Sequence, residues 1–209
     1  MQLTNFQRVC RLGADLLQHP RNVPRYVANN LVSRRSPIAL ALPWFSYGAI
    51  DFLDANLRRD MHVFEFGSGG STIFFAQRCA AVRAVEEEPK WAARVRVHAA
   101  ERGLENLEIA NAPFDFSNPQ EFESSRYLEQ VRTGTWDLIV VDGADNDYTI
   151  RPICFRAAES QVKPGGMIVV DDSWRYTQLR TSNRAQRVQV FESVGPARFG
   201  VTSTDIYFY

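Results

Sequence analysis

Acidic side chains recur where the sequence predicts that buried strands end. These positions are Glu65, Glu86, Asp142, Asp171 and Asp172. In an open α/β sheet, ligands bind beyond the carboxyl ends of the parallel strands. Carboxylates gathered there repel one another and lose hydration, unless a positive charge offsets that energy. The pattern therefore predicts a site for a positively charged ligand, a metal ion or both.

A glycine-rich segment, GSGGST at residues 67–72, follows the first of these strands. Gly67 and Gly69 allow backbone conformations closed to other residues and let a ligand approach the main chain. Ser71 and Thr72 can cap the helix that follows. Thr72 stands where a GxGxxG pattern would have its last glycine, so the alternative is a plain strand-to-helix turn.

Glu86 lies 19 residues after Gly67, at the expected end of the next strand. An acid about 20 residues after the glycine segment can accept hydrogen bonds from the two ribose hydroxyls of a nucleoside. Glu65 precedes the glycines, where an acid would repel the phosphates of a dinucleotide. S-adenosylmethionine suits that charge, because it carries an ammonium and a sulfonium group. The alternative for Glu86 is a solvated acidic run at the start of a helix.

Alternating units position these residues. Strands are expected over 62–66, 82–86, 107–110, 136–141 and 167–170, and helices over 45–57, 71–79, 89–102, 119–132, 148–162 and, as a short turn, 174–179. Segments 188–191 and 205–209 are rich in β-forming residues, and the loop between them is too short for a helix, so they should pair as an antiparallel hairpin. The fold class is therefore a doubly wound, mostly parallel α/β sheet with an antiparallel C-terminal end.

Four motifs carry a family resemblance. They are VFEFGSGGST at 63–72, VE at 85–86, WDLIVVDG at 136–143 and VKPGGMIVVD at 162–171. In this order and spacing they resemble the class I S-adenosylmethionine-dependent methyltransferases, over about residues 45–209. The resemblance implies a seven-stranded Rossmann-like sheet. The cofactor-binding residues that it implies are Glu65, Gly67, Ser68, Gly69, Ser71, Thr72, Glu86 and Asp142. Residues 111–115 lack the usual acid after the third strand, so the adenine contacts stay unassigned; Trp91 could stack there or belong to the core.

The acids after the fourth and fifth strands resemble those of catechol-type and caffeoyl-type O-methyltransferases. In those enzymes the matching positions hold a divalent cation, which implies Asp142, Asp171 and Asp172 as ligands of Mg²⁺ or Mn²⁺. The predicted catalytic residues are Asp142, Asp171 and Arg175, the last because it follows the Asp pair at the rim of the site. The lysine base of the catechol-type enzymes is absent, because Asp145 stands at its position. Arg175 could instead hold an anionic group of the substrate by a bidentate contact, or neutralise Asp171 or Asp172, in which case no metal would be needed.

Residues 1–36 read as a basic helical appendage to an S-adenosylmethionine-binding domain at 37–209. The appendage holds six arginines and one acid, Asp15, which leaves 18 basic and 23 acidic residues for the remainder. It could be a lid, the contact surface of a homodimer, an anchor on acidic lipid, or a helix covering one face of the domain. Three widely spaced cysteines and the lack of a long apolar run favour a cytoplasmic protein without a transmembrane segment.

The leading hypothesis is transfer of a methyl group to a hydroxyl of a small molecule, such as a sugar or a catechol-like ring. An NAD-dependent oxidoreductase and a catalytically silent cofactor-binding or assembly protein are the alternatives. A nucleic-acid substrate is not expected, because the main domain is acidic and no Asn-Pro-Pro-Tyr follows the fourth strand.

Overall fold

The computed structural model describes residues 4–32, 36–115 and 119–209, and it contains one seven-stranded sheet with the strand order β3-β2-β1-β4-β5-β7-β6. The strands are β1 (His62–Phe66), β2 (Ala81–Glu86), β3 (Leu107–Asn111), β4 (Trp136–Val141), β5 (Val162–Asp171), β6 (Arg187–Val194) and β7 (Val201–Phe208). The first five are parallel, β7 runs antiparallel to β5, and β6 pairs antiparallel with β7. This confirms the predicted fold class, including the C-terminal hairpin.

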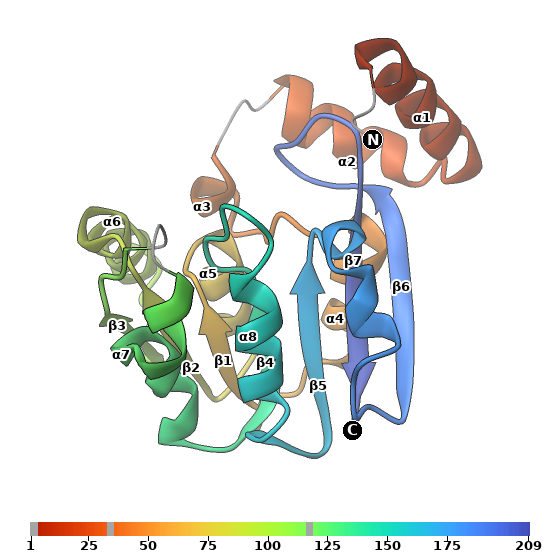
Figure 1. Cartoon of the computed structure of the whole chain (residues 1–209). Coiled ribbons are helices and arrows are strands. Elements are labelled where there is room, and N and C mark those ends of the chain that lie inside the picture. Colours follow the sequence, from red (N-terminus) through yellow and green to blue (C-terminus); the bar gives the residue numbers. More distant parts are fainter. Residues whose placement is uncertain (1–3, 33–35, 116–118) are drawn as a thin grey trace.

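Helices cover both faces of the sheet, with α7 and α8 in front and α4 and α5 behind in the view of Figure 1. The helices are α1 (Asn5–Gln18), α2 (Asn22–Tyr26), α3 (Pro37–Leu40), α4 (Tyr47–Asn56), α5 (Gly70–Ala76), α6 (Pro89–Ala100), α7 (Arg126–Glu129) and α8 (Ile150–Ala158). The alternating side chains of β4 explain the two layers. Ile139 and Val141 pack in the cluster under α8, whereas Leu138 and Val140 pack in the cluster under α4. Strands covered on both faces read as continuous apolar runs, as β4 does.

Three predicted helices differ from those observed. The segment 119–132 is broken into a 3₁₀ helix (Pro119–Ser124), α7 and a second 3₁₀ helix (Gln130–Thr133), because Ser125 caps a new helix by accepting from the Leu128 amide at 3.1 Å. The segment 148–162 is helical only in α8, and β5 already begins at Val162. Residues 174–179 fall in two 3₁₀ helices, Ser173–Arg175 and Thr177–Arg180.

The N-terminal helices lie above the carboxyl ends of the parallel strands (Figure 1). Helix α1 ends at Gln18, just before Pro20, and Pro24 lies in the first turn of α2. A π-helical turn, Val27–Val32, follows. Leu12 and Leu16 of α1 pack on the core cluster of the sheet. The boundary between residues 36 and 37 stays a prediction, as does a homodimer through this segment. In the described part of the chain, no helix is both long and apolar enough for a membrane span.

Candidate active site

Two cavities open at the carboxyl end of the sheet. The first, the glycine-loop cavity, has a volume of about 490 Å³, and its walls include 67–71, 86–88, Asp142 and Asp171. The second, the arginine cavity, has a volume of about 700 Å³ and lies between α1, the end of β5 and the β6–β7 loop. Arg198 lines both cavities, so they adjoin at its side chain. Both volumes lie in the range of small-molecule sites.

The glycine loop fits closely against its neighbours on one side and faces open space on the other. Gly67 has a φ of +87°, and a Cβ there would lie 3.1 Å from the Gly143 Cα. A Cβ on Gly70 would collide with the carbonyl oxygens of Pro37 and Leu42. A Cβ on Gly69 would meet nothing within 4 Å. Gly69 therefore marks the point where a ligand can come close to the main chain.

Glu65 lies behind the loop, although it was expected to bind the cofactor. It is 1% exposed, and its carboxylate accepts hydrogen bonds from the hydroxyls of Ser71 and of Thr72, the latter at 2.6 Å. Burial raises the pKa of Glu65 to about 7, the two hydroxyls lower it, and the charge of Glu86 raises it further. The hydrogen bonds of Glu65 and Thr72 thus hold the glycine loop on the side away from the cavity, while Ser71 lines the cavity.

Glu86 ends β2 and lines the glycine-loop cavity, as the sequence predicts. It is 4% exposed, accepts from the Ser68 hydroxyl at 2.7 Å, and accepts from the Glu88 amide at 3.1 Å. Trp91 donates from Nε1 to the Ser68 carbonyl at 2.7 Å and so fixes the same wall. The structure therefore brings Glu86 and the glycine loop together in one cavity.

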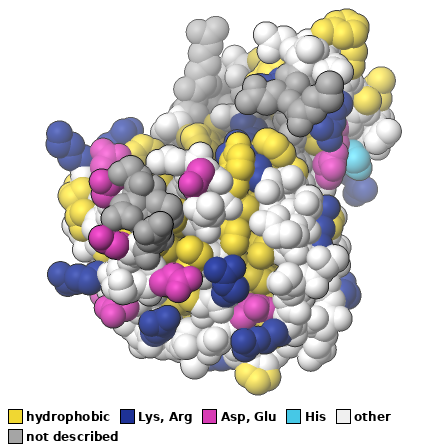
Figure 2. Space-filling view, in the orientation of Figure 1, with side chains coloured by type: hydrophobic (Ala, Val, Ile, Leu, Met, Phe, Trp, Pro, Cys, Tyr) yellow, Lys and Arg dark blue, Asp and Glu magenta, His cyan; other side chains and the backbone are white. Residues whose placement is uncertain are grey.

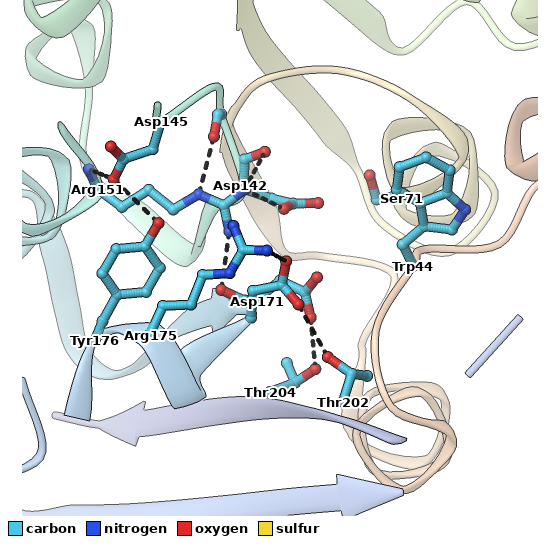
Figure 3. A network of polar contacts seen from close by, with 12 residues as sticks. Trp44, Ser71, Asp142, Asp145, Arg151, Asp171, Arg175, Tyr176, Thr202 and Thr204 are labelled. Carbon is cyan, nitrogen blue, oxygen red and sulfur yellow. Dashed lines mark hydrogen bonds and ion pairs between the residues drawn. The ribbon is translucent and has the colours of Figure 1, made fainter. Parts of the chain in front are cut away.

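Arginine side chains neutralise the carboxylates after β4 and β5. Arg151 pairs with Asp142 at 3.0 Å, and Figure 3 shows it in front of that carboxylate. Arg198 pairs with Asp172 at 2.7 Å and reaches Asp171 at 3.5 Å. Trp44 and Ser71 lie across the open space from this cluster (Figure 3).

Two threonines of β7 complete the cluster. Thr204 donates to Asp171 at 2.8 Å, and Thr202 donates to Asp172 at 3.0 Å. Burial and mutual repulsion raise the pKa values of Asp142 and Asp171. Burial also raises the pKa of Asp172, but the charge and hydrogen bond of Arg198 outweigh burial and bring that pKa below its usual value.

The comparisons with known proteins address the fold. No protein-family model and no curated protein matches the sequence. Among solved structures, the O-methyltransferase TomG from Streptomyces achromogenes, in complex with S-adenosylmethionine, superposes with a TM-score of 0.62 at 18% identity over 99% of both chains. The O-methyltransferase from Bacillus cereus, in complex with S-adenosylhomocysteine, gives 0.57 at 18% identity over 90% of this chain and 97% of that one. An rRNA methylase from Streptococcus thermophilus gives 0.58 at 13% identity over 83% and 97%.

The chain has the class I methyltransferase fold. In this fold the glycine loop follows β1 and Glu86 ends β2, which are the positions that the motifs indicated. The sequence motifs do not identify which arginines pair with the acidic cluster. Arg151 lies on α8, and Arg198 lies in the β6–β7 loop, 26 residues after Asp172. No local pattern connects an arginine in a hairpin loop with an acid that ends another strand.

The donor set does not fit the expected Mg²⁺ or Mn²⁺. Each carboxylate of Asp142, Asp171 and Asp172 already faces a guanidinium, and two also accept from threonine hydroxyls. Within 4–32, 36–115 and 119–209, no group of three or more His, Cys, Asp or Glu side chains is arranged to hold a metal ion. In this structure guanidinium groups supply positive charge beside all three carboxylates.

Arg175, expected to be catalytic, lies in the arginine cavity and not beside the glycine loop. Its closest carboxylate contact is with Asp172, at 3.8 Å, which is longer than a hydrogen bond. Its guanidinium lies over the rings of Trp174, at 4.8 Å, and Tyr148, at 5.2 Å. Arg175 therefore lines the arginine cavity, whereas Arg198 forms the shorter ion pairs with Asp171 and Asp172.

Proposed function

We propose that this protein transfers a methyl group from S-adenosylmethionine to a hydroxyl of a small-molecule acceptor. The observation that carries the proposal is the glycine-loop cavity, where Gly69 opens toward free space beside the buried carboxylate of Glu86. Glu86 would accept from the ribose hydroxyls, and the backbone at Gly67, Ser68 and Gly69 would contact the cofactor. The proposal gives Glu65 and Thr72 the role of supporting the loop, and Ser71 that of a wall residue.

The adjoining arginine cavity would hold the acceptor. S-adenosylmethionine bound in the glycine-loop cavity would supply the methyl group: a C–O bond to the acceptor's hydroxyl oxygen would form as the C–S bond breaks, and the electron pair of the broken bond would stay on sulfur. Because the sulfonium is a good leaving group, the protein has to align the two reactants and remove the hydroxyl proton.

Asp142 is the proposed proton acceptor. It lines the glycine-loop cavity, its side chain is 22% exposed, and burial raises its pKa toward the range useful for a base. Asp171 has a side chain only 3% exposed and holds Thr204 and Arg198. We therefore assign Asp171 a positioning role through these contacts.

RNA is a second candidate acceptor, because rRNA methylases are among the structural neighbours and four arginines line the second cavity. The formal net charge of zero and the small volume of the cavity favour a small molecule. A gel-shift experiment with ribosomal RNA at low salt would test this candidate directly.

Calorimetry with S-adenosylhomocysteine tests the cofactor assignment, with NAD as the comparison ligand. The chain should bind S-adenosylhomocysteine and not NAD. Glu86→Gln should weaken that binding about tenfold or more, because hydrogen bonds to a charged group contribute roughly 1.5–3 kcal/mol. Glu105→Gln, at an exposed position before β3, is the matched control and should bind like the parent. Preference for NAD, or equal affinity of the Glu86 variant, would overturn the assignment.

A further inference from the structure

Positive charge dominates the arginine cavity. Its charged lining consists of Arg8, Arg11, Arg175, Arg198 and Glu192. In the space-filling view, Lys and Arg side chains lie beside hydrophobic ones at the upper centre of the visible face (Figure 2). One acid against four arginines leaves the cavity positive, although the whole chain is formally neutral. A cavity of this composition favours an anionic ligand.

Two of these arginines form short ion pairs within the protein. Arg11 pairs with Glu192 at 2.5 Å, and Arg198 pairs with Asp172 at 2.7 Å. Arg8 has no ion pair with any residue that the structure describes, and its side chain is exposed. The nearest carboxylate oxygen to Arg175 is 3.8 Å away. Its Nε is shielded from solvent and has no hydrogen-bond partner within the described residues. Arg8, and the N–H donors of Arg175 that its long contact with Asp172 leaves without a hydrogen bond, therefore remain to bind a ligand.

Aromatic side chains stand beside the guanidinium of Arg175. Tyr148 and Trp174 are 47% and 54% exposed, although each ring lies against Arg175. Tyr148 also adopts a φ of +67°, which is unfavourable for a residue with a bulky side chain. Strained residues of this kind persist where the surrounding structure holds them, commonly at functional sites. Exposed rings held in place provide a stacking surface for a planar ligand.

From these observations we infer that the acceptor is a hydroxylated aromatic acid whose anionic group is bound by Arg175 and Arg8. This inference rests on the proposed function, because it names the acceptor of that reaction. The aromatic ring would lie against Trp174 and Tyr148. Arg198 lines both cavities, so a hydroxyl at the end of the ring remote from the acid group would be directed toward the glycine-loop cavity. The first helix, which carries Arg8, then forms part of the acceptor site.

The test uses a dihydroxybenzoate and its neutral methyl ester as probes. Binding of each to the full chain is measured by calorimetry, with and without saturating S-adenosylhomocysteine. The acid should bind about tenfold or more tightly than the ester, because charge-assisted hydrogen bonds contribute roughly 1.5–3 kcal/mol. Arg175→Gln and Arg8→Gln should each weaken binding of the acid about tenfold and leave the ester nearly unchanged. Arg132→Gln, an exposed arginine at the opposite end of the strands, is the matched control.

Equal affinity for the acid and the ester, or no binding of the acid at millimolar concentration, would overturn the inference. Retained binding of S-adenosylhomocysteine shows that each variant is folded. If Arg175→Gln does not fold, the test relies on Arg8→Gln, whose side chain is exposed on α1. The two proposals fail separately. If S-adenosylhomocysteine does not bind the parent chain, the proposed function is wrong. The affinities for the acid and the ester, measured without S-adenosylhomocysteine, still show whether the arginine cavity binds an anionic aromatic ligand.

Discussion

The guanidinium of Arg198 bonds to the carboxylate of Asp172 at 2.7 Å and thereby ties the β6–β7 loop to the end of β5. This contact stands at the boundary between the two cavities, because Arg198 lines both of them. It also supplies the positive charge that a divalent cation would otherwise bring to Asp171 and Asp172. The geometry of the acidic cluster therefore depends on a loop far from it in the sequence.

Divalent cations should have no effect on cofactor binding. Because Arg151 and Arg198 already neutralise the acidic cluster, the affinity for S-adenosylhomocysteine should be the same with Mg²⁺ and with a chelator. Calorimetry under the two conditions measures this. A saturable Mg²⁺ heat that disappears in Asp172→Asn would contradict the prediction and restore the metal site expected from the sequence.

Two adjacent glycines should respond differently to an added methyl group. Gly69→Ala places its Cβ in open space, so the protein should keep its stability while the methyl group hinders the cofactor. Gly70→Ala collides with the carbonyl oxygens of Pro37 and Leu42, so it should lower the free energy of unfolding by about 1–3 kcal/mol. Urea unfolding and titration with S-adenosylhomocysteine separate the two effects. Equal stability of the two variants would show that α3 does not press on the loop.

The sequence predicted the sheet well because its signals are local. An apolar run such as WDLIVV in β4, followed by an acid, specifies a buried strand and the end where ligands bind. The prediction of one helix over 119–132 was wrong because the Ser125 side chain caps a new helix at this point, and capping competes with continuation of the preceding helix. The partners of the carboxylates could not be predicted, since Thr202, Thr204 and Arg198 reach them only after the hairpin has packed on β5.

Stability should fall with rising pH through the range in which Glu65 ionises. Burial raises the pKa of Glu65 from its ordinary 4.5 to about 7 in the folded protein. Its contribution to stability is therefore complete below 4.5 and is lost as pH rises to about 7, because only the unfolded chain ionises easily in that window. Glu65→Gln should reduce this decline by roughly 3 kcal/mol. Urea unfolding from pH 4.5 to 8 measures the difference.

A control for the pH series is Glu105→Gln, whose exposed carboxylate should leave the parent's profile unchanged. If the Glu65 variant declines as steeply as the parent, then other acids, such as the partly buried Glu87 with a pKa raised to about 7, carry the whole effect. That result would place the ionised form of Glu65 in the folded loop at neutral pH.

Asp15 connects α1 to strand β6, beside the arginine cavity. It is 7% exposed, and its Oδ2 accepts from the buried Val194 amide of β6 at 3.0 Å. Asp15→Ala leaves that amide without its acceptor and should lower the free energy of unfolding by about 1–3 kcal/mol, whereas Asp15→Asn keeps an acceptor oxygen and should lose less. Because α1 carries Arg8 and Arg11, the alanine variant should also bind a dihydroxybenzoate more weakly, with the affinity for S-adenosylhomocysteine unchanged. A parallel loss of both affinities would show that α1 supports the whole carboxyl edge of the sheet and not the arginine cavity alone.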